Sequence, residues 1–164
     1  MIRKADKNDL EDILEIYNDA ILNTTAVYDY KPHTLNDITK WYDKKNQAGY
    51  PLLVIEEHGK AVAFATFGEF RAWPAYKYTI EHSVYVNKNY RKKGMGMKLM
   101  KEIIKIARER GYVTLVAGID TENEASIKMH QKLGFEFSGI IKKAGFKFDK
   151  WLDLAFYQLD LTSL

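Results

Sequence analysis

A basic, glycine-containing segment, Arg91-Lys92-Lys93-Gly94-Met95-Gly96, offers the clearest chemistry in this sequence. It lies between a strand-like and a helix-like stretch. Glycine permits tight turns and close approach to a ligand, and free N–H groups at a helix start bind anions. The pattern is neither a Walker loop nor a dinucleotide-binding fingerprint. It predicts a phosphate-binding loop, with an ordinary strand-to-helix turn carrying solvated lysines as the alternative.

Three polar residues, Asn123, Ser126 and His130, share one face of a second helix-like stretch, residues 123–133. On a wheel of ~100° per residue they fall between apolar residues of the face that should be buried. Buried polar groups need hydrogen-bond partners. The stripe therefore predicts either a hydrogen-bonded core network or a face turned toward a ligand.

A carboxylate stands in the middle of a third segment, the strand-like stretch 78–86. Alternation places Glu81 on one face with Thr79, Ser83 and Tyr85. A carboxylate in a central strand is costly unless it has a partner. Glu81 is thus either a functional group or a surface residue of a half-exposed sheet.

The elements that must position these residues follow from periodicity and turn signals. Thr34 and Asp37 resemble a capping box at the start of a helix. The order of elements predicts an α/β sheet with helices on both faces. We expect helices over 6–23, 34–46, 97–110 and 123–133, strands over 52–55, 61–67, 78–86, 113–119, 135–141 and 151–159, and a loop over 145–150.

Length and composition set the class of protein. At 164 residues we expect one domain. Lys and Arg number 25 against 22 Asp and Glu, a spread and weak excess that does not indicate nucleic-acid binding. The absence of cysteine excludes disulfides, thiolate zinc sites and cysteine nucleophiles. No apolar run suits a membrane span or secretion signal, so we expect a cytoplasmic protein. We also expect no metal cofactor.

Three motifs, taken in order, carry a resemblance to a known family. Arg91-x-x-Gly94-x-Gly96, then Asn123-Glu124-Ala125-Ser126 and Lys132-Leu133-Gly134-Phe135, resemble the acetyl-CoA-binding core of the GNAT N-acetyltransferases. The resemblance implies a single domain over residues 1–164. It also implies a mixed, mostly antiparallel, twisted sheet of six or seven strands with helices on both faces.

A narrower resemblance is to the phosphinothricin acetyltransferase-like branch, whose members also acetylate methionine sulfone and methionine sulfoximine. It is carried by segments 70–76, 81–86, 117–119, 129–135 and 151–153. It implies direct transfer of an acetyl group from acetyl-CoA to the amine of a small amino acid or analogue. A polyamine or protein N-terminal acetyltransferase, and a non-catalytic acyl-CoA sensor, are the alternatives.

The resemblance also implies roles for particular residues. Glu81 would be the general base. His130 would be catalytic or substrate-binding, where the wider superfamily commonly has a tyrosine acid. Acetyl-CoA would contact Val84, Tyr85, Val86, Arg91, Lys92, Lys93, Gly94, Met95, Gly96, Met97, Asn123 and Ser126, and the acceptor would contact Arg71, Trp73, Tyr76, Tyr28 and Lys147.

Relatives in this branch are often homodimers. The predicted last strand carries Trp151, Phe156 and Tyr157, which suggests a buried edge or a dimer contact. We therefore expect a homodimer that acts on a small molecule, with neither nucleic acid nor membrane as a partner.

Overall fold

A computed structural model describes residues 1–163 of the chain. One sheet contains seven strands in the order β1-β2-β3-β4-β5-β7-β6, and of its pairings within 1–163 only that of β4 with β5 is parallel. The predicted mixed, mostly antiparallel sheet is confirmed. The strands are β1 (Ile2–Lys4), β2 (Leu52–Glu57), β3 (Lys60–Glu69), β4 (Thr79–Val86), β5 (Thr114–Asp120), β6 (Glu136–Lys147) and β7 (Lys150–Asp160), and the helices are α1 (Leu10–Asn23), α2 (Leu35–Ala48), α3 (Met95–Glu109) and α4 (Glu124–Lys132).

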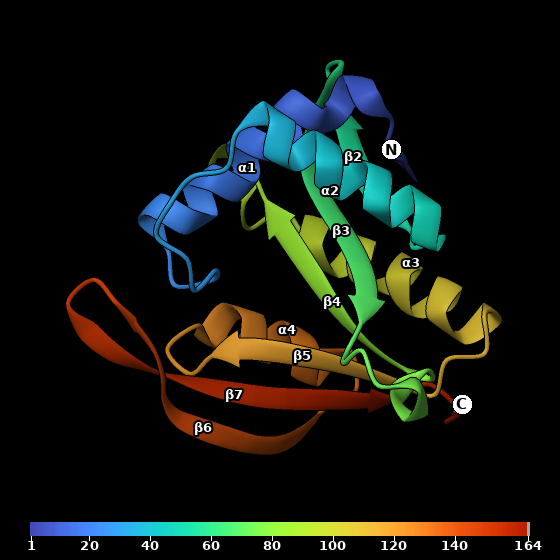
Figure 1. Cartoon of the computed structure of the whole chain (residues 1–164), viewed down its shortest axis with the longest axis vertical. Helices are drawn as coiled ribbons and strands as arrows, with labels where there is room; N and C mark the ends of the chain where they lie inside the picture. The colour runs from blue at the N-terminus through green and yellow to red at the C-terminus, as the bar shows by residue number, and fades with distance from the viewer. Residues whose placement is uncertain (164) are drawn as a thin grey trace.

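Helices cover both faces of the sheet, as predicted (Figure 1). α1 and α2 pack on one face, where Ile13, Ile38 and Phe64 belong to one buried cluster. α3 packs on the other face, where Leu99 and Leu115 belong to a second cluster that α4 also touches. Burial of these two apolar helix faces against the sheet is the main favourable term that holds the layers together.

The sheet opens between β4 and β5. These strands pair only from Thr79 to Glu81 on β4, and beyond Glu81 they diverge (Figure 1). β3 stays paired with β4 as far as Val86. On the β5 side, the backbone groups of residues 82–86 are therefore left without a strand partner. We call this gap the β4–β5 opening.

Helix starts were predictable where capping side chains are present. Thr34 accepts a hydrogen bond from the Asp37 N–H at 3.1 Å, and Asp37 accepts one from the Thr34 N–H at 2.8 Å, which confirms the capping box. The first helix begins at Leu10, not at the predicted Asp6. Asp6 instead caps a short 3₁₀ turn, Lys7–Asp9, that leads into α1.

The predicted loop over residues 145–150 is wrong. β6 runs on to Lys147 and β7 begins at Lys150, so the two strands form one long hairpin. Phe148 and Asp149 make its turn with φ of 52° and 59°, left-handed values that usually call for Gly or Asn. β1 was also missed, because three residues carrying two charges give no alternation to detect.

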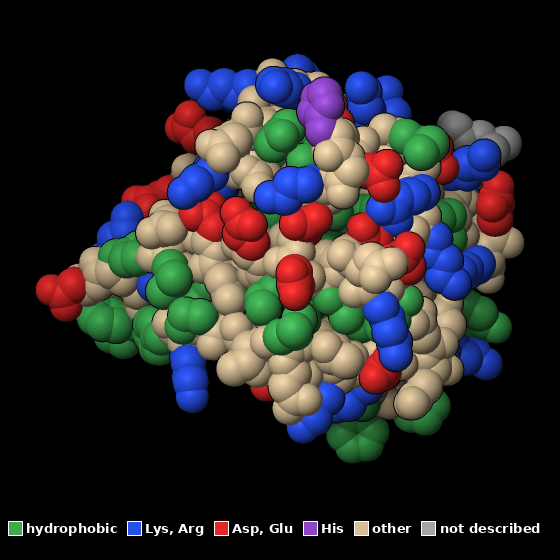
Figure 2. Space-filling view, turned by 90° about the horizontal axis from the view of Figure 1, so that it is seen from above, with side chains coloured by type: hydrophobic (Ala, Val, Ile, Leu, Met, Phe, Trp, Pro, Cys, Tyr) green, Lys and Arg blue, Asp and Glu red, His purple; other side chains and the backbone are tan. Residues whose placement is uncertain are grey.

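Charged side chains of both signs are interspersed over the face shown in Figure 2. Within residues 1–163, each helix is too short or too polar to cross a lipid bilayer.

Candidate active site

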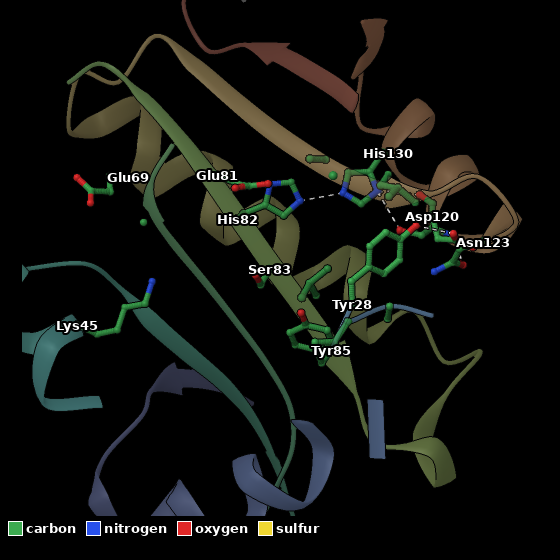
Figure 3. Close-up of a pocket in the computed structure, with 18 residues that line it drawn as sticks. Tyr28, Lys45, Glu69, Glu81, His82, Ser83, Tyr85, Asp120, Asn123 and His130 are labelled. Carbon is green, nitrogen blue, oxygen red and sulfur yellow. Dashed lines mark hydrogen bonds between the residues drawn. The ribbon is translucent and has the colours of Figure 1, made fainter. Parts of the chain in front are cut away.

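A cavity of about 440 Å³ lies at the β4–β5 opening. In Figure 3, Lys45 and Glu69 lie on one side of it, Glu81 and His82 near the middle, and His130, Asp120 and Asn123 on the other side. The predicted site residues that line this cavity are Tyr28, Glu81, Val84, Tyr85, Asn123, Ser126 and His130.

Glu81 is the last β4 residue that pairs with β5, so its carboxylate stands where the sheet divides. A Cβ placed on Gly118 of β5 would lie 3.3 Å from Glu81 Oε2, which means that the missing side chain makes room for the carboxylate. Burial raises the Glu81 pKa, and the positive charge of Arg71 partly opposes this. A carboxylate with a raised pKa beside a cavity is suited to accept a proton.

His82, the neighbour of Glu81, points to the opposite face of β4 and meets His130 of α4. The two Nε2 atoms are 2.8 Å apart, and the rings are stacked with centroids 5.1 Å apart. Both imidazoles are buried, and Phe135 packs edge-on against each. Burial, reinforced for His82 by the neighbouring imidazole, lowers the pKa of both histidines.

The contacts of this pair define its tautomers. His130 Nδ1 is 2.7 Å from the Ser126 carbonyl oxygen, which can only accept, so Nδ1 carries the proton. In a neutral His130 ring, Nε2 is then an acceptor, and His82 Nε2–H donates to it. His82 Nδ1 is left buried without a hydrogen-bond partner among residues 1–163. Both ring nitrogens of His130 are hydrogen-bonded within the protein. In this arrangement His130 has no N–H group left to donate a proton to a ligand.

The segment between α1 and α2 closes one side of the cavity. Tyr28 donates a hydrogen bond of 2.6 Å to Asp120, and Thr25 donates one of 3.0 Å to the same carboxylate. Burial and this carboxylate raise the Tyr28 pKa. The Tyr28 ring also lies against Gly145 of β6, where an added Cβ would be 2.6 Å from a ring carbon. Tyr28 is thus held rigidly at the cavity wall.

Lys147 takes part in this arrangement rather than lining the cavity. Its side chain is buried at the end of β6, and Nζ donates 2.7 Å hydrogen bonds to the carbonyl oxygens of Thr24 and Val27. The expectation that Lys147 lies in a late loop is therefore wrong. Its ammonium fixes the segment that carries Tyr28.

The predicted phosphate-binding loop leads into α3. Gly94 is the N-cap of the helix, with a left-handed φ of 75°, and Lys92 also has a positive φ of 64°. Gly96 faces α4, where an added Cβ would lie 3.2 Å from Met129 Sδ. Arg91 reaches α1 and forms an ion pair of 3.3 Å with Asp19. The free N–H groups of α3 thus stand outside the cavity lining and adjoin the end of β4.

Asn123 and Ser126 belong to the start of α4. Asn123 Oδ1 accepts a hydrogen bond of 3.2 Å from the Ser126 N–H and so caps the helix. On β4, the Tyr85 ring packs against Tyr17 and Phe64 with centroids 5.6 and 5.2 Å apart. The Tyr85 side chain is thus partly buried against the core where it borders the cavity.

The predicted acceptor residues Arg71, Trp73 and Tyr76 do not line the cavity. They lie in the exposed connection between β3 and β4, and the Trp73 side chain is 73% exposed. The Arg71 guanidinium stacks 5.1 Å from the Phe70 ring centre. Arg71 still acts on the site electrostatically, because its charge lowers the pKa of Glu81.

The cavity residues that sequence reasoning missed include three with ionisable side chains, Lys45, His82 and Asp120, besides Glu69. His82 alternates with Glu81, so it falls on the opposite face of the strand among mostly apolar residues, where it drew no attention. Asp120 ends a strand, a place where a buried carboxylate could have been suspected. Lys45 gave no signal, since it lies in a helix that also carries Lys40 and Lys44.

Comparisons with known proteins agree with this geometry. The family model described as an acetyltransferase (GNAT) domain matches residues 2–156. This chain belongs to the GNAT acetyltransferase family. The predicted family and the predicted N-acetyltransferase activity are confirmed.

Individual GNAT relatives cover nearly the whole chain. An L-methionine sulfoximine/L-methionine sulfone acetyltransferase of Salmonella typhimurium is 43% identical over 98% of this chain and 94% of its own length. An N-acetyltransferase crystal structure from Staphylococcus aureus Mu50 has a TM-score of 0.98 and 56% identity, covering 99% of this chain and 98% of that one. A Sinorhizobium meliloti phosphinothricin acetyltransferase in complex with acetyl-CoA has a TM-score of 0.94 and 34% identity, covering 98% and 87%.

The residues present fit acetyl-CoA as the cosubstrate of this GNAT enzyme. Residues 82–86 of β4 have backbone groups free on the side of the β4–β5 opening, where an extended amide-containing chain could pair with them. The α3 N-terminus lies beyond them, with left-handed Gly94 as its N-cap, and the free N–H groups of a helix N-terminus favour anions. Acetyl-CoA has an amide-containing arm followed by phosphates, which matches the order of the free β4 backbone and the α3 N-terminus.

Proposed function

We propose that this enzyme transfers the acetyl group of acetyl-CoA directly to the α-amine of a small amino acid of the methionine sulfone, methionine sulfoximine or phosphinothricin type. The observation that carries the proposal is Glu81, a carboxylate with a raised pKa at the point where β4 and β5 part. The named activities of the relatives support the class of acceptor.

Glu81 is proposed as the general base of the transfer. The amine nitrogen attacks the thioester carbon, a C–N bond forms, and the C–S bond breaks. Glu81 accepts the proton that the amine loses, directly or through water, and the CoA thiolate takes up a proton as it leaves. A free backbone N–H of residues 84–86 would stabilise the negative charge on the carbonyl oxygen.

Direct transfer in a ternary complex is supported by the side chains available. The chain has no cysteine that could hold the acetyl group as a thioester. Both nitrogens of His130 are occupied, by the Ser126 carbonyl and by His82, so His130 is poorly placed to carry it. We therefore propose that His130 acts by shaping the cavity wall next to the reacting groups.

The acceptor would bind between Tyr28 on one side of the cavity and the β3–β4 connection on the other. Tyr28 lines the cavity, and Arg71 lies close enough for its charge to influence Glu81. Arg71 offers a forked donor for the oxygen atoms of a sulfone, sulfoximine or phosphinate. Trp73 and Tyr76 would line the route to the cavity.

The test is CoA release from acetyl-CoA with a panel of amines. The panel contains L-methionine sulfone, L-methionine sulfoximine, phosphinothricin, ordinary amino acids, spermidine and a short peptide. We expect the first three to be the best acceptors. Preference for spermidine or the peptide would replace the amino-acid proposal by one of those acceptors. Acetyl-CoA binding without any turnover would favour a sensor.

We also propose that the enzyme is a homodimer formed through the β6–β7 hairpin. β6 is an edge strand of the sheet, and edge strands with apolar side chains can pair with another chain. The exposed apolar residues on this hairpin include Phe137, Ile140, Ile141, Phe146 and Trp151. Sedimentation equilibrium should give twice the 19.1 kDa mass of the chain. The Ile141→Lys variant should instead give the mass of a single chain. A wild-type protein that stays monomeric at micromolar concentration contradicts the dimer.

A further inference from the structure

Lys45 of α2 reaches the sheet beside the cavity. Its Nζ donates a 2.9 Å hydrogen bond to the Phe67 carbonyl oxygen of β3. The rings of Trp41 and Tyr50 flank the ammonium, with centroids 6.0 and 5.4 Å away. In Figure 3, Lys45 lies on the same side of the cavity as Glu69. Lys45 is thus a cavity residue held by specific packing, not a mobile surface lysine.

The Lys45 ammonium has no counter-ion among the residues that the structure describes. Within residues 1–163 it forms no ion pair. The Phe67 carbonyl uses one of its three N–H donors. Burial lowers the Lys45 pKa to about 8, so the group is still mostly charged at neutral pH. A partly buried cation that has spare donors and lines a cavity is suited to bind an anionic group of a ligand.

A glycine of β3 lets the Lys45 ammonium approach the sheet closely. A Cβ on Gly68 would lie 3.0 Å from Lys45 Nζ. Gly68 stands directly opposite Glu81 in the β3–β4 register, so any side chain there would share a face with Glu81. The missing side chain makes room for the Lys45 ammonium on the sheet face that Glu81 shares.

We propose that Lys45 binds the α-carboxylate of the acceptor amino acid. The inference rests on the proposed function and extends it, because it makes the enzyme selective for amines that carry a neighbouring carboxylate. In an α-amino acid one carbon atom joins the two groups. An amine that reaches Glu81 can therefore direct its carboxylate toward the adjoining strand β3, which the Lys45 ammonium contacts. Arg71 then remains for the oxygen atoms at the far end of the side chain.

The test compares two acceptors that differ only in the carboxylate: L-methionine sulfone and 3-(methylsulfonyl)propan-1-amine. Lys45→Met keeps the length of the side chain and removes its charge. We expect the variant to lose about 10- to 100-fold in kcat/KM for the amino acid, mainly through KM, which is the usual range for a charged hydrogen bond. Activity toward the amine that has no carboxylate should stay within about twofold.

Two control variants accompany this comparison. Lys44→Met alters the exposed neighbour on the same helix and should change neither acceptor. Lys45→Arg keeps the charge and should recover most of the lost activity toward the amino acid. Acetyl-CoA affinity and the thermal midpoint of Lys45→Met should match wild type, which shows that the variant is folded.

Equal loss for both acceptors, or no loss for either, overturns the assignment of Lys45. A failure of the proposed function looks different, because wild-type protein would then acetylate neither acceptor. In that case calorimetric titration of L-methionine sulfone tests Lys45 without turnover. Weaker binding by Lys45→Met than by wild type supports the assignment. Equal binding, or no binding to either protein, overturns it.

Discussion

His82 Nε2 lies 2.8 Å from His130 Nε2, and this contact joins β4 to α4 beside the β4–β5 opening. The Ser126 carbonyl fixes the proton of His130 on Nδ1, so His82 must supply the bridging proton. The hydrogen bond exists in this form only while both rings are neutral. The pair therefore links the geometry of the cavity wall to pH.

Stability should fall as the solution is acidified below about pH 6.5. Burial lowers the pKa of both histidines in the folded protein, so the unfolded chain binds protons that the folded chain does not. The contribution of the two neutral histidines to stability is fully present above the pKa of histidine in the unfolded chain. It is lost as pH falls toward their lowered pKa values in the folded protein. The slope is about 1.4 kcal/mol per pH unit for each such proton. Urea unfolding at pH 8, 7, 6 and 5 measures it.

A pair of variants assigns this slope to the buried histidines. His130→Gln should flatten the dependence of unfolding free energy between pH 6.5 and 5, although it lowers stability at pH 8. His58→Asn changes an exposed histidine in the β2–β3 turn and should retain the wild-type slope. An unchanged slope in His130→Gln contradicts the account of the pair.

The acid limb of the pH–rate profile should report Glu81. Burial raises its pKa above the ordinary value of 4.5, so kcat/KM should fall as pH drops through a value higher than that. Arg71 opposes the rise, and Arg71→Met should therefore move the acid limb to still higher pH. Lys77→Met, an exposed cation of the same connection, serves as the control. An acid limb that does not move in Arg71→Met would contradict the electrostatic effect of Arg71 on the Glu81 pKa.

Acetyl-CoA affinity should depend on the left-handed conformation of Gly94. Alanine disfavours this conformation by about 1–2 kcal/mol. If phosphate binding requires it, Gly94→Ala should weaken acetyl-CoA binding about tenfold, as measured by calorimetry. Gly111→Ala, at the other end of α3 and with a similar φ of 82°, should lower stability alone. Equal acetyl-CoA affinity in both variants would remove the loop from the binding site.

Much of the fold was accessible from sequence because local signals coincide with tertiary needs. The Thr34–Asp37 capping box marks the start of a helix, and it occurs as expected. The β6–β7 hairpin escaped prediction since Phe148 and Asp149 adopt left-handed values without glycine. Its turn is imposed by the long pairing of the two strands, and this pairing cannot be recognised from the residues of the turn alone.

The candidate site was predictable only in part for a related reason. Glu81 and His130 stand out by themselves, because polar groups on faces that should be buried demand an explanation. Lys45 and Asp120 could not be predicted because their partners are distant in sequence. Lys45 bonds to the Phe67 carbonyl, and Asp120 accepts a hydrogen bond from Tyr28. Lys147 was placed near the cavity by resemblance, yet its ammonium turns to the backbone of residues 24 and 27.

The most direct test of the account is the rate of CoA release by Glu81→Gln with L-methionine sulfone as the acceptor. Glutamine keeps the shape of the side chain but cannot accept the proton, so kcat should fall about 10²- to 10⁴-fold. Glu69→Gln, which changes another carboxylate of the same cavity, should keep kcat near wild type. Acetyl-CoA affinity should be unchanged in both variants. A wild-type kcat in Glu81→Gln would contradict the assignment of Glu81 as the base.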